Sequence, residues 1–292
     1  MSAPAHTLAD VTVIVVTYNS AHCLPALQPL LAHCPHVILF DNASQDDTLA
    51  QAAQRLPHAQ LIASPQNLGF GAANNRALAQ VRTPFALLLN PDCELGIEHL
   101  QQLLDVAAQF PEAAVVAPQL ADARGRAEVN YRWPSTHWVS KGAAASGPIC
   151  VGFLCGAAML LRLQVCAPVG FFDERFFLYY EDDDLCLRLF QAQLPMLLVP
   201  EVQVVHRSRG SVKSGSPWRS EYGRGYHHAQ SKLIFAAKHQ GLDAARALRT
   251  RLVWQTVLAL PLRVVAFSPR LIGRMWGRLR GALRWTASGE IA

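Results

Sequence analysis

Short apolar runs rich in β-branched residues alternate with helix-like segments through the first third of the chain. The strand-like runs are Val11–Val16, Val37–Phe40, Leu61–Ile62 and Phe85–Leu89. Helices are predicted between them, from Ser20 or Pro25 to His33, from Asp46 to Leu56 and from Ala72 to Gln80. Uninterrupted apolar runs are typical of strands buried on both faces of a parallel sheet. The alternation therefore predicts an α/β fold with repeated βαβ units, a mostly parallel sheet and helices flanking it.

Polar turns follow three of these strand-like runs. They are Thr17–Ser20, Asp41–Ser44 and Asn90–Asp92. The carboxyl ends of parallel strands share one edge of a sheet, and ligands of open α/β sheets bind at that edge. The turns therefore predict a nucleotide-type site, with ordinary connecting loops as the alternative.

Composition places the chain among folded cytosolic proteins. With 292 residues, 51% hydrophobic and 16% charged, it can bury a sizeable core, which argues against disorder. Its seven cysteines form no Cys-x-x-Cys pair, so reduced thiols are expected. The first 20 residues show no basic region followed by an apolar core, so no secretory signal is expected. Residues 121–148 lack periodicity, which is typical of a long excursion covering an active site.

Positive charge is concentrated near the C-terminus. Nine arginines and no acid lie between Arg246 and Arg284. Subtracting those nine from the 26 basic residues leaves 17 against 21 acidic ones, so the overall charge of +5 does not describe the main body. A body that binds nucleic acid is disfavoured.

Six segments occur in an order and spacing that resemble glycosyltransferase family 2, especially its rhamnosyltransferase-like members. They are Val15–Ser20, Asp41–Thr48, Asn67–Asn75, Leu88–Asp92, Gly170–Glu174 and Glu181–Arg188, and they extend the resemblance over roughly residues 11–216. The resemblance implies a GT-A-type, Rossmann-like fold and a nucleotide-diphosphate sugar donor. It also implies a divalent metal and inversion at the anomeric carbon.

The resemblance assigns the first two turns to the nucleotide. It implies that Asp41 contacts the pyrimidine, with Thr17 and Asn19 beside the nucleotide. A carboxylate held at the end of a buried strand can supply the rigid hydrogen-bond partner that a planar base needs. The alternative is that Asp41 closes its own turn or caps the next helix.

The diphosphate side of the donor is expected near the third helix. Asn67 and Gly69 would permit close backbone approach, and Asn75 with Arg76 would open that helix near the phosphates. A surface arginine with no ligand is the ordinary alternative for Arg76.

Asn90–Asp92 stands where this family places its Asp-x-Asp metal motif. The first Asp is replaced by Asn90, so Asp92 would carry most of the charge. Mg²⁺ or Mn²⁺ prefers oxygen ligands and can bridge a carboxylate to a diphosphate. Family analogy adds His206 to the metal site. The alternatives are an Asx-type turn at Asp92 and a purely structural His206.

Four consecutive acids, Glu181–Asp184, follow the apolar and aromatic run Phe176–Tyr180. Crowded like charges at such a boundary cost free energy unless a metal, a proton or a cation uses them, although an acidic helix cap is the alternative. The hydroxyl of a sugar acceptor is a poor nucleophile at neutral pH, so a carboxylate must take its proton as the new bond forms. Asp182 heads the apolar stripe of the predicted helix and corresponds to the family's base, so we predict Asp182 as catalytic, with Asp183 second.

The C-terminal part predicts helices at a membrane surface. Leu252–Phe267 is too short and too interrupted for a confident spanning helix. In Pro269–Trp285, arginines and apolar residues each recur every four positions, as in a basic amphipathic helix on an anionic membrane. The alternatives are a helix packed on the catalytic domain and a subunit contact. We therefore expect a catalytic domain over residues 1–228 and a basic, membrane-associating helical segment over residues 229–292.

These observations predict an inverting, metal-dependent hexosyltransferase in the cytoplasm, peripheral on the inner face of the cytoplasmic membrane. It would move a sugar to a hydroxyl of a glycan or lipid-linked acceptor in cell-surface polysaccharide synthesis. L-rhamnose from dTDP-L-rhamnose is the donor that the subfamily suggests, and a UDP-hexose is the alternative. The metal identity and oligomeric state stay open.

Two other functions were weighed against this one. A sugar nucleotidyltransferase usually has a glycine-rich basic loop near its N-terminus, whereas residues 11–24 contain no Gly, Lys or Arg. A catalytically silent nucleotide-binding scaffold at the membrane is favoured only by the loss of the first metal-motif Asp. The intact Glu181–Asp182 pair speaks against the scaffold.

Overall fold

The computed structural model describes residues 6–129, 131–132, 144–208, 210–212, 216–265 and 268–286. The chain divides into two compact units. The first comprises Met1–Leu68, Ala73–Phe172 and Leu185–Lys213, and the second comprises Gly69–Ala72, Asp173–Asp184 and Ser214–Ala292. The boundary expected after residue 228 falls inside helix α7 (Pro217–Gln240). Of the expected excursion over residues 121–148, residues 130 and 133–143 lie outside the described chain.

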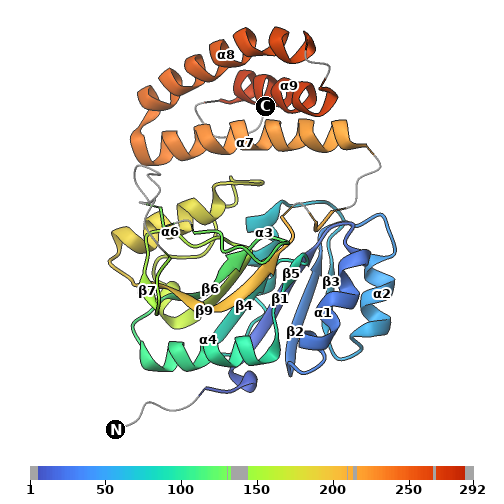
Figure 1. The fold of residues 1–292 in the computed structure, drawn as a ribbon, viewed down its shortest axis with the longest axis vertical. Coiled ribbons are helices and arrows are strands. Elements are labelled where there is room, and N and C mark those ends of the chain that lie inside the picture. Colours follow the sequence, from blue (N-terminus) through green and yellow to red (C-terminus); the bar gives the residue numbers. More distant parts are fainter. Residues whose placement is uncertain are drawn as a thin grey trace. The chain divides into compact units, whose positions relative to one another are not determined.

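The first unit is built on one sheet (Figure 1). Its strands are β1 (Val11–Thr17), β2 (His36–Asp41), β3 (Gln60–Ala63), β4 (Phe85–Leu89), β5 (Cys93–Glu94), β6 (Val115–Ala121), β7 (Ile149–Cys150), β8 (Ala158–Arg162) and β9 (Met196–His206). Their order is β3-β2-β1-β4-β8-β6-β9-β5, with β7 pairing to β9. Strands β1 to β4, β6 and β9 run in one direction, and β5, β7 and β8 run against them. The predicted mostly parallel α/β sheet is confirmed.

Helices connect and flank these strands. They are α1 (Leu24–Leu31), α2 (Thr48–Arg55), α3 (Phe70–Leu78), α4 (Ile97–Gln109), α5 (Leu163–Cys166) and α6 (Glu181–Gln191), with short 3₁₀ turns η1 (Leu8–Asp10) and η2 (Ala21–Cys23). The strands and helices predicted up to residue 92 are confirmed. One core joins alternate residues of β1, β2 and β4, such as Val13, Leu39 and Leu87, to the buried leucines of α1 and α4. Every second residue of a strand enters this core, because successive side chains point to opposite faces of the sheet.

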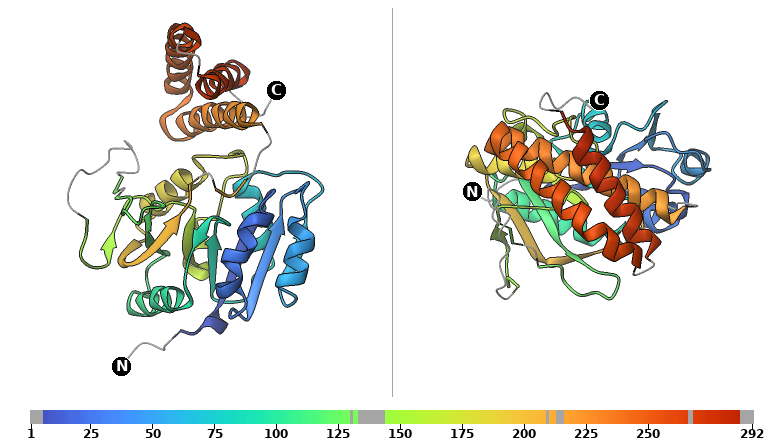
Figure 2. Two further views of the ribbon diagram at one scale, coloured as in Figure 1. Left: turned by 45° about the vertical axis from the view of Figure 1, so that its right-hand side comes forward. Right: turned by 90° about the horizontal axis from the view of Figure 1, so that it is seen from above.

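The second unit contains three long helices that pack on one another (Figure 2). They are α7, α8 (Leu242–Val265) and α9 (Pro269–Arg284), so the helix predicted from Pro269 is confirmed. The buried edge of α9 is a row of glycines at 273, 277 and 281. A Cβ on Gly277 would lie 2.0 Å from the carbonyl oxygen of Tyr222 in α7, so the two backbones approach closely enough to exclude any side chain there.

Helix α8 presents an apolar stripe to solvent. Trp254, Val257, Leu258 and Leu262 recur at helical spacing and are 62%, 43%, 70% and 71% exposed. Within the described residues, no helix is both long enough and apolar enough to cross a membrane. The stripe is therefore an apolar surface on a helix that does not meet the requirements for spanning.

Candidate active site

The Asp41 turn is tied together by hydrogen bonds at the end of β2. The Asp41 carboxylate is buried and accepts the Thr17 hydroxyl at 3.0 Å, the Ser44 hydroxyl at 2.5 Å and the Ser44 N–H at 3.0 Å. Parallel pairing of β1 with β2 sets Thr17 opposite Asp41, which explains the first contact. The structure thus brings two predicted donor-site residues together. Asp41 also closes its own turn, as the alternative proposed.

Asn19 lies at the neighbouring turn and joins it to the Asp41 turn. Its backbone is left-handed, with φ of 51°, and its N–H donates to the Ser44 hydroxyl at 2.8 Å. Its side-chain Oδ1 accepts the N–H of Gln45 at 2.7 Å. Thr17, Asn19 and Asp41 therefore form one connected edge, as expected for turns at the carboxyl ends of adjacent parallel strands.

Asn67 is linked to the same edge through Asn42. The Asn42 side chain donates to Asn67 Oδ1 at 3.0 Å and accepts the N–H of Leu68 at 2.8 Å. Asn42, which is 4% exposed, was not predicted as a site residue. Its position next to Asp41, at the end of a buried strand, was the available signal.

The other residues predicted to bind the nucleotide-sugar donor make contacts of different kinds. Gly69 has φ of 86°, and a Cβ on it would lie 2.3 Å from the carbonyl oxygen of Phe177, so glycine is required there by a neighbouring backbone. The Asn75 side chain makes a reciprocal pair with the backbone of Phe172, donating at 2.9 Å and accepting at 3.1 Å. Arg76 is exposed on α3.

Asp92 lies in the turn between β4 and β5 and contacts the segment that follows β9. Its backbone carbonyl accepts the N–H of Arg207 at 2.9 Å. Its Oδ2 accepts the N–H groups of Gly210 and Ser211, each at 3.0 Å. A Cβ on Gly210 would lie 2.6 Å from the Arg207 carbonyl oxygen and 3.2 Å from the Asp92 Cβ, so glycine permits both the tight turn after Arg207 and the close approach to Asp92. One side of the carboxylate is therefore fixed by backbone donors.

The other carboxylate oxygen of Asp92 faces His206. Antiparallel pairing of β5 with β9 sets Cys93 opposite His206 and so brings the imidazole to the turn. His206 Nε2 lies 3.5 Å from Asp92 Oδ1, which is buried and accepts no hydrogen bond from any described residue. Two ligands of one cation, each at about 2.1 Å from it, lie roughly 3 Å apart. The unpaired oxygen and the imidazole therefore fit a divalent cation better than they fit a hydrogen bond.

Cys93 completes a cluster whose ligand atoms all lie within 4.8 Å of one another, Asp92 and His206 being the other members. Its Sγ donates to the carbonyl oxygen of Ala157 at 3.4 Å. Burial first, and then the charge of Asp92, raises the pKa of this thiol well above its usual value. A protonated thiol is a poor ligand for Mg²⁺ or Mn²⁺, which favour oxygen. Asp92 and His206 are therefore the donors that suit such an ion.

The acids at the start of α6 occupy different environments. Glu181 is 6% exposed, and its buried Oε2 has no hydrogen-bond partner among the residues that the structure describes. Burial, followed by the charges of Asp182 and Asp183, raises the pKa of Glu181 well above its usual value, which favours the neutral acid. Asp182 and Asp183 are only half-buried, and Asp182 Oδ1 accepts the N–H of Asp183 at 3.0 Å. Asp182, the predicted base, is thus one of the two partly accessible acids.

Asp184 has distant partners that the sequence did not indicate. It is 0% exposed, and its Oδ1 lies 2.6 Å from Lys238 Nζ and 2.8 Å from His239 Nε2, both near the end of α7. Lys238 also pairs with Asp173 at 2.7 Å. The partners lie more than fifty positions away in sequence, and no local pattern relates them.

The backbone in front of α6 is held in an unusual conformation. Tyr179 and Tyr180 have φ of 72° and 68°, a region that costs of order 1–3 kcal/mol for a residue with a side chain. Both rings make edge contacts with His228, at centroid distances of 5.6 and 5.5 Å. Such strain concentrates at functional sites, and here it fixes the direction in which α6 begins.

Comparison with known proteins identifies relatives of the chain. The sequence model of glycosyl transferase family 2 matches residues 12–167, which is more than half of the chain. The chain is 29% identical over 295 residues to the N-acetylglucosaminyl-diphospho-decaprenol L-rhamnosyltransferase of Mycobacterium tuberculosis. That alignment covers 84% of this chain and 93% of the mycobacterial protein.

Solved structures share the fold at low sequence identity. The mannosyltransferase PcManGT from Pyrobaculum calidifontis, in complex with GDP-Man and Mn²⁺, matches with a TM-score of 0.55 and 15% identity, over 94% of this chain and 86% of that one. GalNAc-T7 with UDP, GalNAc and Mn²⁺ matches with a TM-score of 0.54 and 14% identity over 78% of this chain. The present chain spans 51% of GalNAc-T7. The predicted GT-A-type fold is confirmed by these similarities.

Proposed function

The chain belongs to glycosyl transferase family 2, and we propose that it transfers L-rhamnose from dTDP-L-rhamnose to a hydroxyl of a lipid-linked saccharide. Similarity to the mycobacterial L-rhamnosyltransferase over nearly the whole of both chains supports this donor and an acceptor carried on a lipid diphosphate. The product would serve cell-surface polysaccharide synthesis. Inversion at the anomeric carbon is the stereochemistry that the family resemblance implies.

The observation that carries the proposal is the half-satisfied carboxylate of Asp92. Its Oδ2 is fixed by two backbone donors, whereas its buried Oδ1 faces His206 and accepts no hydrogen bond from the residues that the structure describes. A buried carboxylate oxygen without a donor is costly unless an ion binds it. Mg²⁺ or Mn²⁺ held by Asp92 and His206 would stabilise negative charge on the leaving nucleoside diphosphate. The Mn²⁺ in the two solved glycosyltransferases supports this choice of ions.

The chain's own groups supply the other requirements of the reaction. Asp182 is proposed to take the proton from the acceptor hydroxyl as it attacks the sugar, opposite the departing diphosphate. Partial exposure keeps this carboxylate reachable, and its place in the first turn of α6 favours the ionised form through the helix dipole. Neighbouring Glu181 is driven towards its neutral form, which removes one competing negative charge from the site.

Donor recognition is proposed for the connected edge of turns. Asp41, Thr17 and Asn19 would hold the nucleotide, with Asn67, Gly69, Asn75 and Arg76 on the diphosphate side. The hydrogen bonds from Thr17 and Ser44 fix the Asp41 carboxylate in one orientation. A preorganised acceptor of this kind can select a pyrimidine base without paying for side-chain ordering on binding.

A peripheral position on the inner face of the cytoplasmic membrane is proposed for the second unit. The exposed apolar stripe of α8 and the arginines between Arg246 and Arg284 support it. Apolar side chains can enter the headgroup region while arginines pair with anionic lipids. This position would give the enzyme access to an acceptor whose lipid stays in the membrane.

A nucleotide-sugar panel tests the proposed function. Purified protein is incubated with dTDP-L-rhamnose or UDP-hexoses, with Mg²⁺, Mn²⁺ or EDTA, and with or without a saccharide on a lipid diphosphate. We expect metal-dependent release of dTDP and formation of a rhamnosylated lipid. Turnover of a UDP-hexose instead would correct the donor. Binding of a nucleotide sugar without any transfer would favour the silent scaffold, and no binding at all would contradict the proposal.

A further inference from the structure

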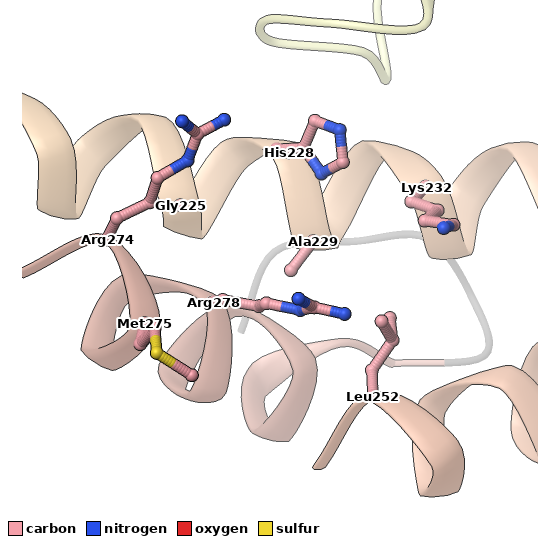
Figure 3. A pocket seen from close by; sticks show the side chains of 8 residues that line it. All are labelled: Gly225, His228, Ala229, Lys232, Leu252, Arg274, Met275 and Arg278. Carbon is pink, nitrogen blue, oxygen red and sulfur yellow. The ribbon is translucent and has the colours of Figure 1, made fainter. Parts of the chain in front are cut away.

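The second unit contains a cavity of about 250 Å³ (Figure 3). Its lining comes from all three long helices. The lining residues are Gly225, His228, Ala229 and Lys232 from α7, Leu252 from α8, and Arg274, Met275 and Arg278 from α9. Every ionisable side chain in this lining is a base. Figure 3 shows Arg278 extending along the space between α7 and α9, with Ala229 above it and Leu252 beyond its end.

The positive charges of the cavity repel one another, although the charge of Asp183 opposes this repulsion at His228. Burial, together with repulsion from Arg278 and Arg251, lowers the pKa of Lys232. Burial, together with repulsion from Arg274, lowers the pKa of Arg278. Arg274 reaches one carboxylate oxygen, that of Glu221, at 4.0 Å, and Glu221 is already paired with Arg224 at 2.8 Å. Folding therefore brings repelling cations together around an empty space, which favours a bound anion.

The hydrogen-bond donors that line the cavity suit a phosphate group. Arg274 and Arg278 offer planar forks that bind phosphate oxygens in pairs, and Lys232 adds a compact charge. The pKa of His228 is lowered to about 4, mainly by burial and then by the same three cations, so its imidazole is a neutral hydrogen-bonding group near pH 7. The cavity is smaller than the ~300–1,000 Å³ of sites that enclose a whole drug-sized ligand, so it suits a charged group and not an entire glycolipid.

The cavity adjoins the segment that leads into α6. Tyr179 and Tyr180 contact the ring of His228, and the Ser231 hydroxyl donates to the carbonyl oxygen of Leu178 at 2.9 Å. Tyr180 immediately precedes α6, whose first turn carries Asp182. The cationic cavity and the proposed base thus belong to the same compact unit. A phosphate held in the cavity would have its attached saccharide near the start of α6.

We propose that this cavity binds the diphosphate of the lipid-linked acceptor and so positions the acceptor sugar. The inference rests on the proposed function, because it names where that reaction's acceptor is held. It assigns Lys232, Arg274 and Arg278 as binding residues. The apolar stripe on α8 gives the same unit a surface for the lipid end of this acceptor.

A binding measurement tests the cavity without relying on turnover. Geranyl diphosphate is titrated by calorimetry into wild type, the double variant Lys232→Met/Arg278→Gln and the control Arg280→Gln, all in EDTA. Arg280 is exposed on the same helix and does not line the cavity. Loss of two charge-assisted contacts should weaken binding at least 10- to 100-fold in the double variant only. Equal binding by all three proteins, or none by wild type, would overturn the proposal.

Transfer kinetics then identify the source of the phosphate. With an acceptor on a lipid diphosphate, the double variant should show a KM raised about 10- to 100-fold. Its KM for the same saccharide on a phosphate-free alkyl chain should be unchanged. An equal loss with both acceptors would contradict diphosphate recognition. Loss of binding to phosphatidylglycerol vesicles without any change in acceptor KM would assign the cavity to membrane phospholipid instead.

A stability readout separates ligand binding from a structural role. Removing mutually repelling charges should leave the Tm of the double variant equal to or above that of wild type. A lower Tm together with lost binding would indicate that the cations support the helices and would count against the proposal. Failure of the proposed function would appear differently, as absent donor turnover in wild type with the geranyl diphosphate result intact.

Discussion

The Asp92 turn and the start of α6 each contain a buried aspartate beside a histidine. The two carboxylates differ in how many charged and hydrogen-bonding partners the protein gives them. Asp184 Oδ1 is matched by Lys238 Nζ at 2.6 Å and His239 Nε2 at 2.8 Å. Asp92 Oδ1 has only His206 Nε2 at 3.5 Å and no hydrogen bond within the described chain. The protein neutralises the first carboxylate itself, whereas the second fits the divalent cation proposed above. Burial alone therefore does not distinguish a structural acid from a functional one.

The largest effect is expected at the partly accessible acid of α6. Asp182→Asn removes the proposed base and should lower the transfer rate ~10²–10⁴-fold while leaving dTDP-L-rhamnose affinity unchanged. Single-turnover kinetics and donor titration measure the two quantities. Asp183→Asn is the matched variant and should lose less than about tenfold. If the larger loss followed Asp183, the base would be reassigned within the same turn.

Asp92→Asn should abolish the response to metal with little effect on folding. Weaker coordination should lower the metal-dependent rate about 10²–10³-fold, because several kcal/mol of charge stabilisation depend on the ion. The Tm should hardly change, since Oδ1 accepts no hydrogen bond from the described residues and the amide oxygen of Asn can still accept the N–H groups of Gly210 and Ser211. Mn²⁺ binding followed by electron paramagnetic resonance and a thermal melt measure these outcomes. Unaltered Mn²⁺ affinity would remove Asp92 from the metal site.

Asp184→Asn should give the opposite result. Breaking the charge balance with Lys238 and His239 in a buried site should cost about 3–5 kcal/mol of unfolding free energy and lower the Tm by roughly 10 °C. The metal affinity of the folded fraction should stay at the wild-type value. Thermal melts and Mn²⁺ titration at low temperature provide the comparison. A stable variant that has lost metal binding would reverse the roles assigned to the two carboxylates.

Packing between α7 and α9 supports the helix that carries the Asp184 partners. Gly277→Ala places a methyl group 2.0 Å from the Tyr222 carbonyl oxygen and should destabilise the protein by about 1–3 kcal/mol. Gly223→Ala, on α7 with no atom within 4 Å of the added Cβ, should stabilise it by about 0.5–1 kcal/mol. Urea unfolding distinguishes the two. Equal effects would mean that α9 does not pack through its glycine edge.

The last comparison concerns pH. His227 stacks on Phe177 at 4.2 Å, and burial lowers its pKa to about 4. In the unfolded chain this histidine has a pKa of about 6.5, so between about pH 6.5 and 4 it is protonated in the unfolded state and neutral in the folded one. The free energy of unfolding should therefore fall as the pH drops through this range. His227→Phe keeps the stacking and should remove up to about 1.4 kcal/mol per pH unit from that slope. Urea unfolding at several pH values measures it, and an unchanged slope would exclude His227 as a source.

Local sequence patterns were sufficient for the first four strands and for the order of the turns that follow them. Apolar runs predict β1, β2, β3 and β4, because strand and helix periodicities act over a few residues. Helix α4 and strand β6 were not predicted, although both are regular elements of the sheet region. The expectation that Asp41, Thr17 and Asn19 lie at one edge follows from parallel strand direction, and the structure brings these residues together.

The sequence by itself determined the fold class, the family and the candidate metal and base residues, because motif order and strand spacing are written along the chain. Tertiary structure decided which acids are neutralised. Lys238 and His239 reach Asp184 across more than fifty residues. The helical-face argument, which set Asp182 on the apolar stripe, did not identify Glu181 and Asp184 as the buried acids. Tertiary structure also placed Arg274 and Arg278 of α9 at a cavity, because the glycine edge fixes which side of that helix meets α7. Charge compensation depends on distances between elements, and only packing sets those distances.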